Sequence, residues 1–207
     1  MNFFGHAIAA RRVDDAPAFV LGAMAPDLLP LCGAVADSET SPEVGAGQAH
    51  HRSVDAIFHA SPAFGALQAW ATGELRQHGL PRGAARGAAH VGIELFLDGV
   101  LARDTGARDG YLRCLRDAET THAPFVWHDE ASRQRWWSLV LRLRTGAIPD
   151  AYRDPAFVGA RIIGALARRP RLALPDADAA TLHAFLPALA ARVDAEAPSL
   201  VGALLTG

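Results

Sequence analysis

The sequence predicts an all-α protein that forms a single helical domain over residues 1–207. Ala, Leu and Arg, which favour helices, fill most of the segments between Gly and Pro breakers. No alternation of apolar and polar residues is long enough to predict a β-strand. The length suits one domain with a buried core, and neither an internal repeat nor a linker divides the chain.

Start and stop signals delimit the predicted helices in chain order. Ser61-Pro62 predicts the start of one helix, Gly79 its end, and Pro81 the start of the next. The segment from Gly83 to Arg103 has apolar residues at helical spacing and should be central. Further helices are expected at 107–120, 130–145, 155–168, 177–193 and 196–205.

Two other segments have a recognisable composition. Residues 32–47 are rich in Gly, Ser and Pro, which predicts a surface loop. An aromatic cluster consists of Phe125, Trp127, Trp136 and Trp137. Such a cluster can line a ligand pocket, but aromatic residues at this density usually pack a core, and we expect core packing here.

Charge and composition exclude several classes of function. All 20 residues counted as Lys or Arg are Arg, and with 22 acidic residues the net charge is −2, which argues against binding of nucleic acid by bulk charge. No run approaches the about 18 apolar residues of a membrane-spanning helix, so we expect no integral membrane association. Cys32 and Cys114 are too few and too far apart for a disulfide framework. With no recognisable signal peptide, a cytoplasmic location is expected.

His and carboxylate residues recur at a spacing of four. His51, Asp55 and His59 form one series, and a second series runs from His90 through Glu94 to Asp98. Residues four apart on a helix are rotated by only about 40°, so each series forms one stripe of side chains. Carboxylates in the apolar stretch around Asp98 would each cost several kcal/mol if buried without a partner.

The stripes predict a divalent metal site inside a helical bundle. Nitrogen and oxygen ligands without thiolate suit Mn, Fe or Zn. The predicted ligands of one or two ions are His6, Asp27, His51, His90 and Glu94. The ordinary alternative is that these residues are surface charges or helix caps, with Glu94 and Asp98 paired to Arg86 or Arg103.

Several short motifs also follow one another along most of the chain. They are Met1-Asn2-Phe3-Phe4-Gly5-His6, Gly47-x-x-x-His51-Arg52-x-x-Asp55 with Pro62 beyond it, Glu94-x-x-x-Asp98-x-x-Leu101, Tyr152-Arg153-Asp154 and Arg168-Arg169-Pro170-Arg171-Leu172. In this order they resemble the acyl carrier protein phosphodiesterases. The resemblance implies a fold related to HD-type phosphohydrolases, a divalent ion with Mn preferred, and hydrolysis of the phosphodiester between 4′-phosphopantetheine and a serine of acyl carrier protein. The polar motif positions that it carries over are His6, Asp27, His51, Asp55 and Asp98.

The chain departs from that family at several positions. Gly99 stands where the family pattern has His, Phe58-His59 where it has Thr-Asp, and Glu94 where it has Asp. Gly22-Ala-Met-Ala-Pro-Asp27, His50-His51 and His90-x-x-x-Glu94 resemble instead the zinc-dependent phospholipase C-like hydrolases. Both resemblances imply phosphodiester hydrolysis, on acyl carrier protein or on a lipid or small phosphodiester. The third interpretation is a non-catalytic helical metal-binding or interaction module.

For phosphodiester hydrolysis we predict Asp55, Asp98 and His59 as catalytic residues, with Asp55 or Asp98 bridging ions or orienting the attacking water. Arg52 is expected to face the phosphate. Arg168, Arg169 and Arg171 form the densest cationic run and could bind a phosphate or an acidic carrier protein. Their ordinary alternative is a helix end at which cations complement the dipole. The oligomeric state is left open.

Overall fold

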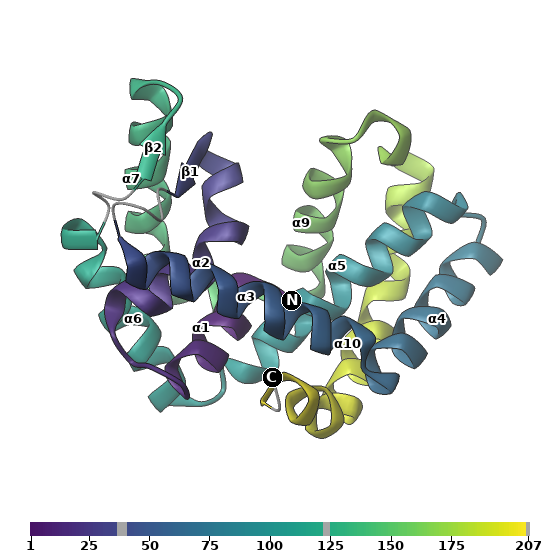
Figure 1. Ribbon diagram of the computed structural model, residues 1–207. Coiled ribbons are helices and arrows are strands. Elements are labelled where there is room, and N and C mark those ends of the chain that lie inside the picture. Colours follow the sequence, from purple (N-terminus) through teal and green to yellow (C-terminus); the bar gives the residue numbers. More distant parts are fainter. Residues whose placement is uncertain (37–40, 122–124, 206–207) are drawn as a thin grey trace.

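A computed structural model describes residues 1–36, 41–121 and 125–205 (Figure 1). Within these residues the chain is mainly helical, and the predicted all-α class is confirmed. The helices are α1 (Phe3–Arg11), α2 (Pro17–Cys32), α3 (Pro42–Ala60), α4 (Pro62–Gln77), α5 (Arg82–Leu101), α6 (Thr105–Thr121), α7 (Glu130–Arg144), α8 (Ala147–Ala151), α9 (Pro155–Ala167) and α10 (Asp176–Leu205), with a 3-10 turn η1 (Pro170–Leu172). None of the described helices is long and apolar enough to cross a bilayer.

Side-chain caps explain where several helices begin. The Ser61 hydroxyl accepts a hydrogen bond from the Phe64 amide, and α4 starts at Pro62 as predicted. Asp154 caps α9 in the same way by accepting from the amide of Ala156. Gly79 has φ of 98°, a left-handed conformation that glycine adopts at low cost, and it follows the end of α4.

Three parts of the fold differ from the prediction. Two short antiparallel strands, β1 (Ala34–Ala36) and β2 (Phe125–Trp127), pair Ala34 with Trp127, and three residues are too few to produce a visible alternation. The predicted surface loop over 32–47 is wrong for its last part, because Ser41 caps α3, which starts at Pro42; residues 37–40 lie outside the described ranges. The two helices expected at 177–193 and 196–205 are one helix, α10, which contains Pro187 and Pro198.

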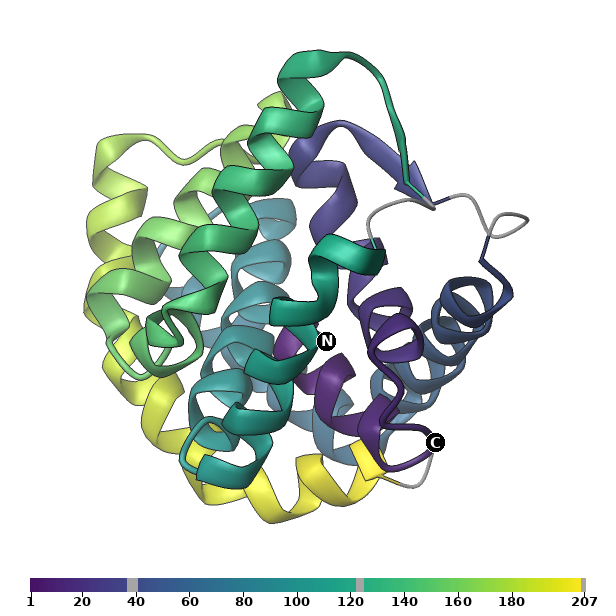
Figure 2. The same cartoon turned by 90° about the vertical axis from the view of Figure 1, so that its left-hand side faces the viewer.

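Helix α5 packs against several other helices, as expected for a central helix. It contacts α1, α4, α9 and α10, and its residues Ile93 and Leu97 are fully buried. In Figure 2, α10 follows one outer edge and the base of the molecule and ends beside α1. The aromatic cluster packs the core as predicted, with Trp136 fully buried and its ring centroid 5.0 Å from that of Phe125.

The crossing of α2 and α3 is a backbone-to-backbone contact made possible by two glycines. A Cβ atom at Gly22 would lie 2.3 Å from the carbonyl oxygen of Val44, and one at Gly47 would lie 2.1 Å from that of Phe19. No larger residue fits either position without separating the helices. The close crossing brings the ring of His51, one turn after Gly47, against the α2 backbone.

Candidate metal centre

The predicted site residues come from four helices and lie close together. In Figure 1, α2 and α7 form one arm of the molecule, α9 and α10 form the other, and the N-terminus lies between them at the base. The residues come from α1 (His6), α2 (Asp27), α3 (His51, Asp55, His59) and α5 (His90, Glu94, Asp98). The two stripes therefore converge, and their neighbours come from α1 and α2.

His6, Asp27 and His51 form the first group of candidate metal ligands. One ligand atom from each residue lies within 4.8 Å of the others. The Nε2 atom of His6 is 3.9 Å from Oδ2 of Asp27, and the His6 and His51 rings stack with centroids 3.7 Å apart. These separations leave room for an ion between the three side chains, since metal–ligand bonds of about 2.0–2.2 Å require donor atoms some distance apart.

The protonation of the first group suits metal binding. His51 Nδ1 lies 2.8 Å from the carbonyl oxygen of Ala23, which can only accept, so Nδ1 carries the proton and Nε2 keeps its lone pair. Burial lowers the pKa of His6 to about 4 and also lowers that of His51, so both rings are neutral near pH 7. Burial raises the pKa of Asp27 well above its usual value, and a cation would reverse that shift.

The first group contains buried polar atoms without a hydrogen-bond partner. They are both ring nitrogens of His6 and Oδ2 of Asp27. Leaving such a group unsatisfied costs about 1–3 kcal/mol, and native proteins rarely do so without a ligand. The unpartnered atoms of His6 and Asp27, together with the Nε2 lone pair of His51, are a donor set that fits a divalent ion.

His59, His90 and Glu94 form the second group, in which the hydrogen-bonding groups are already paired. Glu94 Oε1 lies 3.0 Å from His59 Nε2, 2.9 Å from His90 Nε2 and 2.7 Å from the amino group of Met1. Although burial raises the pKa of Glu94, these three neighbours lower it overall. Hydrogen bonds to Asp55 and Glu94 raise the pKa of His59 to about 9, so this ring is protonated near pH 7.

Asp55 lies between the two groups. Its carboxylate is 3.6 Å from His6 Nε2, 3.1 Å from His59 Nδ1 and 2.8 Å from the amino group of Met1. Burial raises its pKa, but His59, His6 and the amine outweigh burial, and the net pKa is lowered. For the amine the order is similar: burial disfavours its charge, yet Glu94 and Asp55 raise its pKa. Asp55 is therefore an ionised carboxylate in contact with both groups.

Asp98, which ends the second stripe, contacts α1 instead of the two groups. It is fully buried and accepts hydrogen bonds from Asn2 Nδ2 at 2.8 Å, the Gly5 amide at 2.9 Å and the Phe4 amide at 3.3 Å. Burial raises its pKa to about 7 in spite of these bonds. These contacts hold the first turn of α1, which carries His6, and they fit a positioning residue better than the predicted catalytic one.

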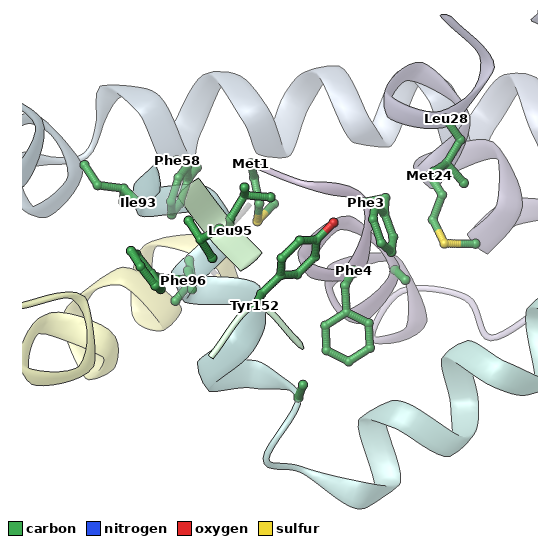
Figure 3. Packing of buried hydrophobic residues seen from close by; sticks show 14 of the residues in the cluster. Met1, Phe3, Phe4, Met24, Leu28, Phe58, Ile93, Leu95, Phe96 and Tyr152 are labelled. Atoms are coloured by element: carbon green, nitrogen blue, oxygen red, sulfur yellow. The ribbon is translucent and has the colours of Figure 1, made fainter. Parts of the chain in front are cut away.

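The surroundings of Asp98 also explain Gly99, where the resembling family has His. A Cβ atom at Gly99 would lie 2.7 Å from the carbonyl carbon of Tyr152, so α5 and the residues before α9 are in backbone contact there. The Tyr152 ring in turn lies beside that of Phe3 (Figure 3), and the two ring centroids are 6.4 Å apart. A histidine at position 99 would be incompatible with this packing.

Three of the four predicted arginines line cavities that also contain residues of the centre. Arg52 is exposed on α3 and lines a cavity of about 510 Å³ together with His51 and Asp55. Arg168 and Arg169 line another cavity of about 510 Å³ together with His90. Arg171, on η1, is exposed and lines neither cavity.

The ion pairs weighed as an alternative for the second stripe do not form in the described structure. Arg103 pairs with Asp194 at 2.6 Å, and the partners of Glu94 and Asp98 are those given above. Reasoning from side chains missed the amino group of Met1, which contacts both Asp55 and Glu94, and the Gln68 amide, 3.0 Å from His90 Nδ1. The available signal for the Met1 amino group was its place at the start of the same short motif that contains His6.

No protein-family model, curated protein or solved structure matches this chain. The resemblance to acyl carrier protein phosphodiesterases is therefore untested and stays a prediction. The fold and the two groups define a helical protein with a candidate divalent-metal centre. Any narrower assignment has to be argued from the chemistry of the centre.

Proposed function

We propose that the protein is a metal-dependent phosphodiester hydrolase whose ion is held by His6, Asp27 and His51. The observation that carries this proposal is the set of buried, unpartnered donor atoms on His6 and Asp27 beside an oriented His51. Three protein ligands leave coordination positions for water and substrate, as in catalytic zinc sites with two His and one carboxylate. Mn is favoured by the family resemblance, and Zn or Fe also suits these ligands.

The proton-carrying residues of the centre suit hydrolysis. A bound divalent ion supplies a low-pKa water nucleophile and polarises the phosphoryl oxygens. Asp55, which is ionised and close to His6, can orient the attacking water by accepting its hydrogen bond. His59, protonated near pH 7, can donate a proton to the leaving alkoxide. Asp98 then acts through α1 as a positioning residue.

The second group is a weaker metal site in this proposal. A second ion there would have to displace the proton of His59 and the contacts of Glu94 with the Met1 amine. The predicted ligands His90 and Glu94 are therefore assigned to holding His59 and the amine when one ion is bound. Metal stoichiometry distinguishes this one-ion centre from a two-ion centre.

The specific substrate is proposed from the resemblance alone. It is holo acyl carrier protein. The same proposal includes a fold related to HD-type phosphohydrolases and a cytoplasmic location. The alternative of a lipid or small phosphodiester uses the same centre. Conversion of holo carrier to apo carrier, measured by mass spectrometry, separates the two enzymic interpretations.

The proposed function is tested with His51→Ala and, as a control, His78→Ala, which changes an exposed histidine outside both groups. Bound metal is measured by elemental analysis and turnover with bis(p-nitrophenyl) phosphate. We expect His51→Ala to lose metal and turnover with helical circular dichroism retained, and His78→Ala to keep all three. Full metal occupancy and unchanged turnover in His51→Ala would reject the proposal. Metal binding without any phosphodiester turnover in the wild type would favour the non-catalytic module.

A further inference from the structure

A further cavity extends away from the candidate metal centre. A cavity of about 640 Å³ is lined by residues of α2 and α7 on one side and of α9 on the other, the helices of the two arms in Figure 1. Asp27 of the first group and Asn2 line it. Its volume is within the range of about 300–1,000 Å³ typical of small-molecule sites. The cavity therefore connects the centre to space for the rest of a substrate.

Arginines from both arms line this cavity. Arg135 and Arg142 come from α7, and Arg161 and Arg168 come from α9 or its C-cap. Among the described residues of the lining, Asp27 is the single acidic one. Cations on facing walls repel one another, and the cavity itself offers few charges to compensate them.

Three of these arginines have no carboxylate within ion-pair distance in the described part of the chain: Arg142, Arg161 and Arg168. Arg135 differs, because it lies 3.7 Å from Asp129 and donates to the carbonyl oxygen of Cys32. Other arginines of the described residues are paired, among them Arg11, Arg103 and Arg133, and others, such as Arg12 and Arg76, are exposed without an ion pair. What distinguishes Arg142, Arg161 and Arg168 is that they line one cavity beside the centre.

Much of the remaining wall of the cavity is apolar, beside polar residues such as Asn2 and Gln134. Leu28, Leu95 and Leu139 line it and are themselves 1%, 6% and 9% exposed, which makes them a firm hydrocarbon surface. Arg168 and Val91 also line the neighbouring cavity that contains His90. Cationic and apolar surfaces therefore meet in the cavity beside Asp27 of the first group, and the neighbouring cavity reaches His90 of the second.

We propose that Arg142, Arg161 and Arg168 bind a second anionic group of the substrate, a phosphate or a carboxylate carried on an apolar portion. The scissile phosphodiester would lie at the first group, and that part of the inference rests on the proposed function. The binding of an amphiphilic anion in the cavity does not depend on hydrolysis. The substrate class is thus an amphiphilic phosphodiester with an additional negative charge remote from the bond that is cleaved.

The binding test uses metal-stripped full-length protein and titration calorimetry. The probes are octyl phosphate, octanoate and uncharged octyl glucoside, below their micellar concentrations. We expect the wild type to bind at least one octyl anion ten times more tightly than octyl glucoside, and the better anion identifies phosphate or carboxylate as the second group. The double variant Arg142→Gln/Arg161→Gln should lose at least tenfold in affinity for that anion.

The control is Arg133→Gln, on the same helix α7 but paired with Glu130 and absent from the cavity lining. It should bind the octyl anions as the wild type does, and circular dichroism checks that each variant is folded. Equal affinity of the wild type for the anions and for octyl glucoside overturns the proposal. Unchanged affinity in a folded double variant overturns it as well.

A kinetic test with metal-loaded protein separates this inference from the proposed function. The substrates are octyl p-nitrophenyl phosphate and its analogue that carries, at the end of the alkyl chain, the anionic group preferred in the binding test. We expect kcat/KM at least tenfold higher for the analogue in the wild type, and a ratio near one in Arg142→Gln/Arg161→Gln. Equal turnover of both substrates by the wild type would overturn the second anion site alone. Absence of turnover would overturn the proposed function, and the binding test would still decide this inference.

Discussion

Replacement of Gly47 by Ala should weaken the protein and its metal centre together. The added Cβ would lie 2.1 Å from the Phe19 carbonyl oxygen and 2.8 Å from the Ala23 amide nitrogen. Atoms in ordinary contact are about 3.5 Å apart, so α2 and α3 would have to separate by roughly 1 Å. Both obstructing atoms are backbone, which no side-chain rotation can move. The separation also acts on the 2.8 Å hydrogen bond between Ala23 and His51.

The expected magnitude follows from three contributions. Overpacking of this kind costs about 1–3 kcal/mol. Loss of the bond to His51 adds about 1 kcal/mol, and the better helix propensity of Ala offsets it by about the same amount. The net loss in the free energy of unfolding should be about 2 kcal/mol. Gly73→Ala is the matched control, because no atom lies within 4 Å of its added Cβ, and it should stabilise by up to about 1 kcal/mol.

The assay is urea denaturation followed by circular dichroism, with metal affinity measured on the same samples. Gly47→Ala should have a lower midpoint and at least tenfold weaker metal binding, while Gly73→Ala has an equal or higher midpoint and unchanged binding. If Gly47→Ala were as stable as Gly73→Ala, the close crossing of α2 and α3 would be refuted. If it lost stability but kept metal affinity, the link from this crossing to His51 would be refuted.

Three further predictions concern the centre itself. Because burial lowers the pKa of His6 to about 4, its neutral ring binds fewer protons than in the unfolded chain between pH 4 and 6.5. The stability that the neutral ring contributes is fully present above pH 6.5 and is lost as the pH falls toward 4. The unfolding free energy of metal-free wild type minus that of His6→Gln should therefore fall by about 3 kcal/mol from pH 7 to 4. A constant difference argues against the lowered pKa of His6. Asp98→Ala removes the acceptor of three bonds to α1 and should weaken metal binding at least tenfold in equilibrium dialysis; unchanged affinity would exclude its positioning role. Metal at 100 times its Kd should stabilise the wild type by about 2.7 kcal/mol in thermal unfolding, and EDTA or His51→Ala should remove this gain; a gain retained in His51→Ala contradicts the ligand assignment.

The helices and the stripes could be predicted because they depend on local spacing. Residues four apart share a helix face whatever the rest of the fold does, so the sequence indicated that His51, Asp55 and His59 act together. The spacing within a stripe does not show which residues of other helices each end of the stripe contacts. Asp98 illustrates this limit, since it is in register with His90 and Glu94 but lies under the first turn of α1.

The division of the ligands into two groups depended on contacts between distant elements. His6 and Asp27 lie beside His51 because α1 and α2 both pack against α3. The crossing at Gly22 and Gly47 sets the distance between α2 and α3. The positions of the glycines in the sequence do not indicate which residues of another helix will contact them. The Met1 amine was missed for a simpler reason, because motif reasoning weighs side chains and overlooks backbone groups.

The most direct test is the location of the metal. Crystals grown with Mn²⁺ near neutral pH, measured for anomalous scattering, should show a peak coordinated by His6, Asp27 and His51 at full occupancy. Any peak at His59, His90 and Glu94 should be weaker and grow as the pH approaches 9, when His59 loses its proton. A strong peak at the second group with none at the first, or no peak at either, would contradict the assignment of the metal centre.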